Sequence, residues 1–197
     1  MSEISIKIGL LGNSSVWKTS LIRRFIENKF EDNYMSTVGV DYFDKIITIN
    51  NKEIKLAIQD TSGEERFRSL ARNYYKNVDG VMFVFDVTNS ESFNEGIKYW
   101  LTECDNQIKE YKKILVGNKI DLYEELKIIS KESIEKFAES KNMKYFEASA
   151  KEGTNVEKIF IELAEFILRN KGEKMGGKNK KLGDRNNSKN KKKCCIF

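Results

Sequence analysis

Histidine is absent from this sequence of 197 residues. Its absence removes imidazole bases and histidine-ligated metal sites from the possible chemistry. Any reaction must use carboxylates, hydroxyls, lysines, backbone amides or a bound ion. Cysteine is scarce as well, since Cys104 stands alone and Cys194 and Cys195 are adjacent near the end. This arrangement is not a disulfide framework, and it suits a reducing cytosol.

Long apolar runs are also missing. No run approaches the roughly 18 residues of a membrane span, so we expect no segment to cross a bilayer. The first five residues lack the basic and apolar regions of a secretory signal. Ser2 stands where N-myristoylation requires a glycine. Apolar residues still make up 40% of the chain, which is enough for the core of one domain.

Positive charge is concentrated at one end of the chain. Residues 171–193 hold ten Lys and Arg and two Asp and Glu, a net charge of +8. The rest of the chain holds 25 basic and 28 acidic residues, a net charge of −3. A nucleic-acid-binding domain would carry its positive charge on the fold, so we expect no nucleic-acid partner. A basic tail indicates an anionic membrane surface, and a solvated disordered end explains the charge equally well.

Short apolar runs alternate with amphipathic stretches over residues 4–168. Strands are predicted at 4–11, 45–49, 53–58, 80–87, 113–117 and 145–148, and helices at 18–30, from 89 or 90 to about 108, from 130, and from a capping box at 154–157 to 168. The pattern predicts an α/β fold with about six mostly parallel strands, one antiparallel edge strand and helices on both faces. We expect one domain over residues 1–170 and a disordered basic tail over 171–197.

Four polar segments follow predicted strands, where the ligands of such sheets bind. They are 12–19, 60–63, 118–121 and 149–151. The first resembles the phosphate-binding P-loop and comprises Gly12, Asn13, Ser14, Ser15, Val16, Trp17, Lys18 and Thr19, with Ser20 next in the chain. Its amides and the following helix N-terminus suit a polyphosphate. Alone, the segment would be read as an ordinary strand-to-helix turn.

Each of these segments suggests a role in binding a nucleotide. Lys18 would reach the β- and γ-phosphates, Thr19 would ligate Mg²⁺, Asp60 would hold that ion through water, and the Gly63 amide would face the γ-phosphate. Asn118, Lys119 and Asp121 would read the base, because the Asp121 carboxylate can accept from guanine N1–H and N2 but finds no donor there on adenine. The Lys119 stem can lie along the purine, and the Ala150 amide, between Ser149 and Lys151, can donate to guanine O6.

The chain resembles the Rab family of small GTPases over about residues 4–170. The segments that resemble the family are residues 60–75, residues 146–151 and residues 34–42, the last being Tyr34, Met35, Ser36, Thr37, Val38, Gly39, Val40, Asp41 and Tyr42. The resemblance implies a P-loop G domain and an effector region at 34–42. It implies that Thr37 joins Mg²⁺ when GTP is bound. It further implies a monomer that meets exchange factors, GTPase-activating proteins, effectors and a prenyl-binding escort protein.

Three positions depart from the family pattern. Trp17 replaces the second P-loop glycine, so either the indole points outward at some cost or nucleotide affinity falls, and we expect weakened binding. Glu64 replaces the glutamine that orients the attacking water, which predicts slow hydrolysis with Glu64 at the catalytic position. Gln59 replaces a tryptophan that Rabs present to effectors beside Tyr42 and Tyr74, which predicts unusual effectors.

The ending predicts a lipid anchor. Cys194 and Cys195 read either as part of a C-a-a-X box with terminal Phe197 or as a double-cysteine ending, and both predict geranylgeranyl groups. The sequence therefore predicts a GTP- and GDP-binding switch in vesicle traffic on the cytoplasmic face of a membrane, with a cytosolic pool. The alternative is a non-cycling membrane-tethered scaffold in which Trp17 weakens or abolishes nucleotide binding. A P-loop kinase of small substrates is disfavoured by the guanine motif and the lipid tail.

Overall fold

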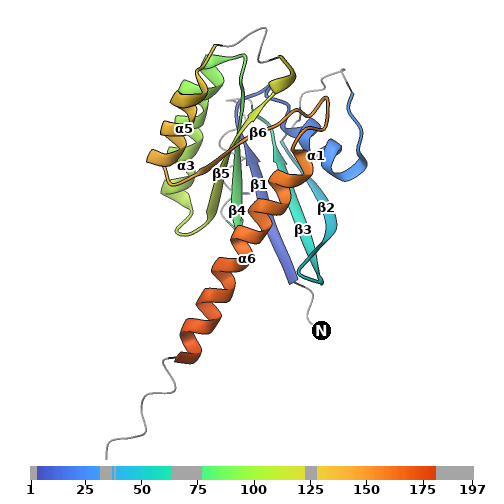
Figure 1. The fold of residues 1–197 in the computed structure, drawn as a ribbon, viewed down its shortest axis with the longest axis vertical. Coiled ribbons are helices and arrows are strands. Elements are labelled where there is room, and N and C mark those ends of the chain that lie inside the picture. Colours follow the sequence, from blue (N-terminus) through green and yellow to red (C-terminus); the bar gives the residue numbers. More distant parts are fainter. Residues whose placement is uncertain (1–3, 32–36, 38, 64–76, 123–127, 181–197) are drawn as a thin grey trace, which may run out of the picture. The chain divides into compact units, whose positions relative to one another are not determined.

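The computed structural model describes residues 4–31, 37, 39–63, 77–122 and 128–180 (Figure 1). The chain divides into two units, Met1–Ile167 and Leu168–Phe197. The first unit contains the sheet and all four polar segments that follow its strands. Among the helices in the described ranges, none combines the length and the hydropathy that a bilayer span requires.

The sheet has six strands in the order β2-β3-β1-β4-β5-β6. Their bounds are Ile4–Leu11 for β1, Val40–Ile49 for β2, Lys52–Thr61 for β3, Gly80–Asp86 for β4, Lys112–Asn118 for β5 and Lys144–Glu147 for β6. Only the β2–β3 pair is antiparallel, and the other four pairs are parallel. The predicted α/β fold with one antiparallel edge strand is confirmed.

The β2–β3 hairpin is longer than the apolar pattern predicted. Its register runs from Val40 opposite Thr61 to Ile49 opposite Lys52. The first half of β2, residues 40–44, mixes Val40, Tyr42 and Phe43 with two aspartates and is largely exposed, as an edge strand allows. No regular apolar alternation marks it, and periodicity alone therefore missed it. Asn50 and Asn51 make the turn with φ values of 51° and 59°. Two positive φ values in a two-residue loop match the twist of a tight hairpin.

Two helices differ from their predicted bounds. The stretch predicted from residue 89 or 90 to 108 is a π-helix, η2 (Ser92–Ile97), followed by α3 (Lys98–Gln107). Asn89 caps it as expected, accepting from the amides of Glu91 and Ser92 at 3.0 and 3.2 Å. Helix α6 (Val156–Lys180) begins inside the predicted capping box of 154–157, directly after Asn155 with its φ of 58°. It continues beyond residue 168, because extending a formed helix adds one hydrogen bond per residue.

Helices α1 (Lys18–Glu27) and α5 (Lys131–Ser140) begin where expected, and η3 (Ile120–Leu122) was not predicted. Helix α1 ends at Asn28, whose φ of 54° stops it short of the predicted residue 30. Helix α5 is capped by the Ser130 hydroxyl, and η3 is one 3₁₀ turn. Figure 1 shows α3 and α5 on one side of the sheet and α1 with the start of α6 on the other. The stacked rings of Phe25 and Phe160, 4.1 Å apart, join α1 to α6.

Candidate nucleotide-binding site

The turn between β1 and α1 follows the predicted P-loop path. A Cβ on Gly12 would fall 2.1 Å from the carbonyl oxygen of Val84, so only glycine fits there. Ser15 and Trp17 both take left-handed backbone, with φ values of 63° and 64°. That conformation costs a residue with a side chain about 1–3 kcal/mol. The turn therefore keeps the P-loop path with a strained tryptophan where the motif has glycine.

Lys18 braces this turn from inside. Its side chain is buried, and Nζ donates to the carbonyls of Gly12 and Asn13, both at 2.9 Å. Burial lowers the pKa of Lys18 to about 8, and the nearby charge of Asp60 opposes that shift. A partly desolvated cation held within the loop is well placed to attract an anionic group.

Three oxygen-bearing side chains meet beside Lys18. Thr19 Oγ1 donates to Asp60 Oδ2 at 2.5 Å and lies 2.9 Å from Thr37 Oγ1, which in turn donates to the same carboxylate oxygen at 3.3 Å. Burial raises the pKa of Asp60, against the opposing effects of Lys18 and the two hydroxyls. Asp60 Oδ1 is buried with no hydrogen-bond partner in the described part of the chain. This donor set fits Mg²⁺, which prefers oxygen ligands and fills its remaining positions with water and phosphate.

Gly63 closes the phosphate side of the site. A Cβ there would lie 2.2 Å from both the Asn13 carbonyl carbon and the Ser14 amide nitrogen. The backbone after β3 therefore lies directly against the P-loop. The segments at 12–19 and 60–63, predicted to share one edge of the sheet, do come together.

Asn118 joins the phosphate and base regions. Its side chain is fully buried, Nδ2 donates to the carbonyl of Val16 at 2.9 Å, and Oδ1 accepts from the Ala150 amide at 3.1 Å. The sequence predicted that the Ala150 amide donates to guanine, whereas here its hydrogen is taken by Asn118. Asn118 is thus a brace between the P-loop and the 149–151 segment.

Asp121 is held in place from one side only. Its Oδ1 accepts from the Ser149 hydroxyl at 2.6 Å, and that hydroxyl accepts from the Glu152 amide at 3.0 Å. Its Oδ2 is buried and finds no donor among the described residues. A buried carboxylate oxygen without a donor is costly, and a ligand with an N–H group would relieve that cost.

Lys119 is held between a carboxylate and an aromatic ring. Its backbone has a φ of 67°, and Nζ lies 2.6 Å from Asp86 Oδ2, both side chains being nearly buried. The same Nζ lies 4.5 Å from the centre of the Trp17 ring. The Trp17 ring also lies 5.0 Å from the ring of Phe30, at 58° between planes.

Comparisons with known proteins agree with this arrangement. Residues 7–169 match the Ras family. The chain is 44% identical over 162 residues to "Ras-related protein Rab-1" of Theileria parva, covering 82% of this chain and 73% of the relative. It is 43% identical over 163 residues to "Ras-related protein Rab-30" of Homo sapiens, covering 82% and 79%. This chain belongs to the Rab family of small GTPases, within the Ras family. The family generally binds GTP and GDP with Mg²⁺.

Two residues that hold the site of this Rab-family GTPase in place were not identified from its sequence. Arg24 donates to the carbonyls of Ala150 and Lys151 at 2.9 and 2.6 Å, and nothing in a helical arginine signals that role. Asp86 holds Lys119, and its signal was present, since it is the one charged residue in an otherwise apolar strand.

The predicted effector region of the GTPase is described only in part. Thr37 and residues 39–42 are described, and Tyr42 is 60% exposed on β2. Gln59 pairs with Tyr42 in the sheet register as expected, but it is only 9% exposed and so offers little surface to a partner. Other predicted positions lie outside the described residues: Tyr34, Met35, Ser36, Val38, Glu64, Tyr74, Cys194 and Cys195.

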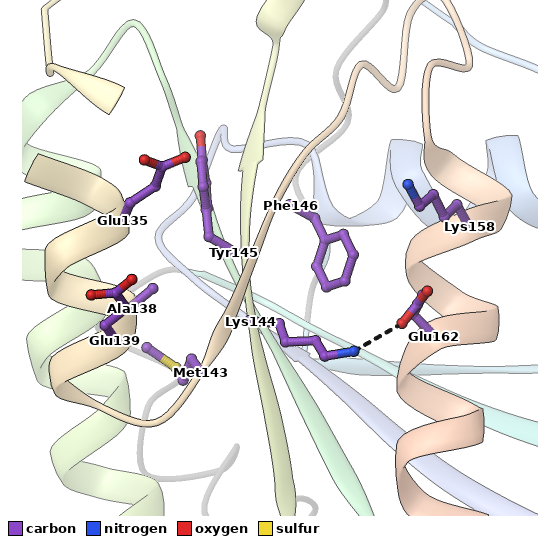
Figure 2. Close-up of a pocket in the computed structure, with 9 residues that line it drawn as sticks. All are labelled: Glu135, Ala138, Glu139, Met143, Lys144, Tyr145, Phe146, Lys158 and Glu162. Carbon is purple, nitrogen blue, oxygen red and sulfur yellow. Dashed lines mark hydrogen bonds and ion pairs between the residues drawn. The ribbon is translucent and has the colours of Figure 1, made fainter. Parts of the chain in front are cut away.

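A separate hollow of about 430 Å³ lies along β6, outside these segments (Figure 2). Figure 2 shows Tyr145 pointing toward α5 and Phe146 toward α6, as alternating strand residues do. Lys144 crosses to Glu162 on α6, with an Nζ–Oε2 distance of 3.2 Å. This hollow contains none of the predicted site residues.

Proposed function

We propose that this Rab-family GTPase is a guanine-nucleotide-dependent switch that cycles between GTP and GDP. The observation that carries the proposal is the buried, unpartnered Oδ2 of Asp121 beside Lys119. Guanine presents N1–H and the N2 amino group on one edge, and together they satisfy both oxygens of a carboxylate. Adenine has no donor at those positions, so it would leave the cost of the buried oxygen in place.

The P-loop side supports a bound polyphosphate and Mg²⁺. Thr19, Thr37 and Asp60 would hold the ion, with Thr37 joining in the GTP state, and the ion would neutralise phosphate charge when bound. Lys18 would exchange its bonds to the carbonyls of Gly12 and Asn13 for phosphate oxygens. The remaining predicted contacts are backbone amides of residues 13–20 and of Gly63.

Hydrolysis belongs to this proposal as a slow reaction. Glu64 stands where the family has its water-orienting glutamine, and its negative charge would face an anionic γ-phosphate. A partner that supplies an arginine would accelerate the reaction. Exchange factors, GTPase-activating proteins and effectors are the partner classes that this cycle requires.

The setting that we propose is the cytoplasmic face of a cell membrane or endomembrane, with a cytosolic pool, in vesicle traffic. Geranylgeranyl groups on Cys194 and Cys195 would anchor the chain, and the basic residues before them would attract anionic lipid. A prenyl-binding escort protein would carry the cytosolic pool. The exposed Tyr42 and Ile46 of β2, 60% and 62% exposed, give effectors an apolar surface to bind.

A competition experiment tests the guanine assignment. Purified protein in Mg²⁺ is titrated with labelled GDP and challenged with unlabelled GTP, GDP or ATP. We expect GTP and GDP to compete and ATP to fail at comparable concentrations. Asp121→Asn places an amide N–H donor opposite the N–H donors of guanine and should remove most of the affinity for guanine nucleotides. Asp44→Asn, an exposed change on β2, is the control and should leave that affinity unchanged. Equal affinity for ATP and GTP would contradict the proposal.

A second candidate function is the non-cycling membrane-tethered scaffold. The observation that favours it is the Trp17 ring lying against Lys119 of the base-reading motif. Assaying the purified protein for co-purified guanine nucleotide separates the two, because a scaffold would carry none.

A further inference from the structure

The indole of Trp17 lies against Lys119 of the base-reading segment and Phe30 of the chain after α1, and the space beside these two residues is called the slot below. Lys119 Nζ lies 4.5 Å from the centre of the Trp17 ring, and the Phe30 ring lies 5.0 Å from the Trp17 ring. Trp17 and Phe30 are only half-buried, so the slot opens to solvent. The indole is a planar fused bicycle, close to a purine in size and shape.

The same slot is the one that the proposed function assigns to guanine. Lys119 is the residue whose stem would cover the purine, and Asp121, two positions later, has the free buried oxygen that would read it. The indole has one N–H, and no hydrogen bond joins it to Asp121 in the described structure. The ring therefore fills the space of a purine but leaves the guanine-reading carboxylate unsatisfied.

We infer that Trp17 is a built-in competitor of the guanine ring, which occupies the purine slot in the nucleotide-free protein and must swing out before a nucleotide binds. This inference rests on the proposed function. Trp17 then weakens nucleotide binding by occupying the slot, rather than by distorting the phosphate-binding loop, and the protein is in equilibrium between a closed and an open slot. Guanine gains what the indole lacks, namely two donors for Asp121.

The contacts of the indole set the expected size of the effect. An ammonium over an aromatic face and one aromatic pair together favour the closed slot by roughly 10- to 100-fold. Apparent affinity falls by the fraction of molecules with an open slot. Lys119 cannot easily leave the ring, since its Nζ is tied to Asp86 Oδ2 at 2.6 Å.

Substitutions at Trp17 separate the side chain in the slot from the Cβ at the phosphate loop. Trp17→Ala removes the ring and keeps the Cβ, Trp17→Gly removes both, and Trp17→Phe keeps an aromatic ring. GDP affinity is measured in Mg²⁺ for these three variants and the natural protein. We expect Trp17→Ala to bind GDP about 10- to 100-fold more tightly than the natural protein, and Trp17→Phe to gain much less.

Fluorescence gives an independent readout, since the chain has two tryptophans and Trp100 is fully buried. Subtracting the spectrum of Trp17→Phe from that of the natural protein isolates Trp17. We expect saturating GDP to shift this difference emission to longer wavelength and to increase its quenching by acrylamide, as the indole enters water.

The outcomes distinguish this inference from the function on which it rests. If Trp17→Ala binds GDP no more tightly than the natural protein, the competitor is overturned while guanine binding stands. An unchanged Trp17 emission at saturating GDP overturns it in the same way. If neither the natural protein nor Trp17→Gly binds any guanine nucleotide, the proposed function fails and the inference fails with it.

Discussion

Arg24 Nε donates to the carbonyl oxygen of Ala150 at 2.9 Å, although 126 positions separate the two residues in the chain. The same guanidinium reaches the carbonyl of Lys151 at 2.6 Å and the carbonyl of Asn28 at 3.0 Å. One side chain therefore ties the helix after the P-loop to the segment that follows β6. The phosphate and base halves of the site are held together by contacts that no nucleotide supplies.

We predict that Arg24→Ala lowers the free energy of unfolding by about 1–3 kcal/mol, because three carbonyls lose a charged donor. Guanine nucleotide affinity should fall with it, since Ala150 and Lys151 lose their support. Arg24→Lys should recover only part of both, because an ammonium does not reproduce the planar fork. Urea unfolding and GDP titration measure the two effects. Arg23→Ala, which removes one exposed ion pair, is the matched control, and an equal loss there would contradict the prediction.

Asn118→Asp should be more damaging than its small change in size suggests. The new carboxylate cannot donate to the Val16 carbonyl and places a charge in a fully buried position. We expect a loss of about 2–4 kcal/mol in the free energy of unfolding. Asn142→Asp, an exposed change at a left-handed position that aspartate tolerates, should be nearly neutral. Similar urea midpoints for the two variants would refute the role of Asn118 as a brace.

Cys104 should resist thiol reagents in the folded protein. It is fully buried on α3, and burial raises the pKa of its thiol, so the reactive thiolate is scarce at neutral pH. In a variant with Cys194 and Cys195 changed to serine, a colourimetric thiol reagent at pH 8 should report no reaction until denaturant is added. Rapid labelling without denaturant would place the thiol at the surface instead.

Glu64→Gln should speed GTP hydrolysis, because the amide orients water without facing the γ-phosphate with a negative charge. Single-turnover rates in Mg²⁺, at enzyme concentrations that saturate GTP, compare the two proteins directly. A GTPase-activating partner with an arginine finger should add about 10³- to 10⁵-fold to the rate of Glu64→Gln. A natural protein that hydrolyses GTP as fast as the variant would contradict the predicted role of Glu64.

Membrane attachment should depend on lipid first and on charge second. Each buried methylene contributes roughly 0.8 kcal/mol and each basic residue near the surface about 1 kcal/mol before screening. Changing Cys194 and Cys195 to serine should release the protein from sedimented membranes with every lysine intact. Neutralising Lys191, Lys192 and Lys193 should instead redistribute it among membranes and reduce its sensitivity to salt. Continued sedimentation of the double-serine variant would rule out the lipid as the anchor.

Much of the fold could be predicted because its determinants are local. Alternation and helical spacing are read within a few residues, so the strands at 4–11 and 80–87 and the start of α1 agree with the structure to within a residue. The first half of β2 could not be read in this way. It pairs with β3 along the edge of the sheet, where its apolar and acidic side chains are largely exposed and do not alternate regularly, so no apolar pattern marks it.

The sequence by itself determined which residue types end each strand, and parallel pairing then required the P-loop, Asp60, Asn118 and Ala150 to share one edge. Only the tertiary structure decided how these residues use their polar atoms. Asn118 hydrogen-bonds the Val16 carbonyl rather than leaving its amide free for a ligand. Arg24 and Asp86 hold residues that lie far away in the sequence, and the Trp17 indole lies by Lys119. The reason is physical: periodicity depends on neighbours in the chain, whereas a hydrogen bond or ring contact depends on packing between elements that no local pattern encodes.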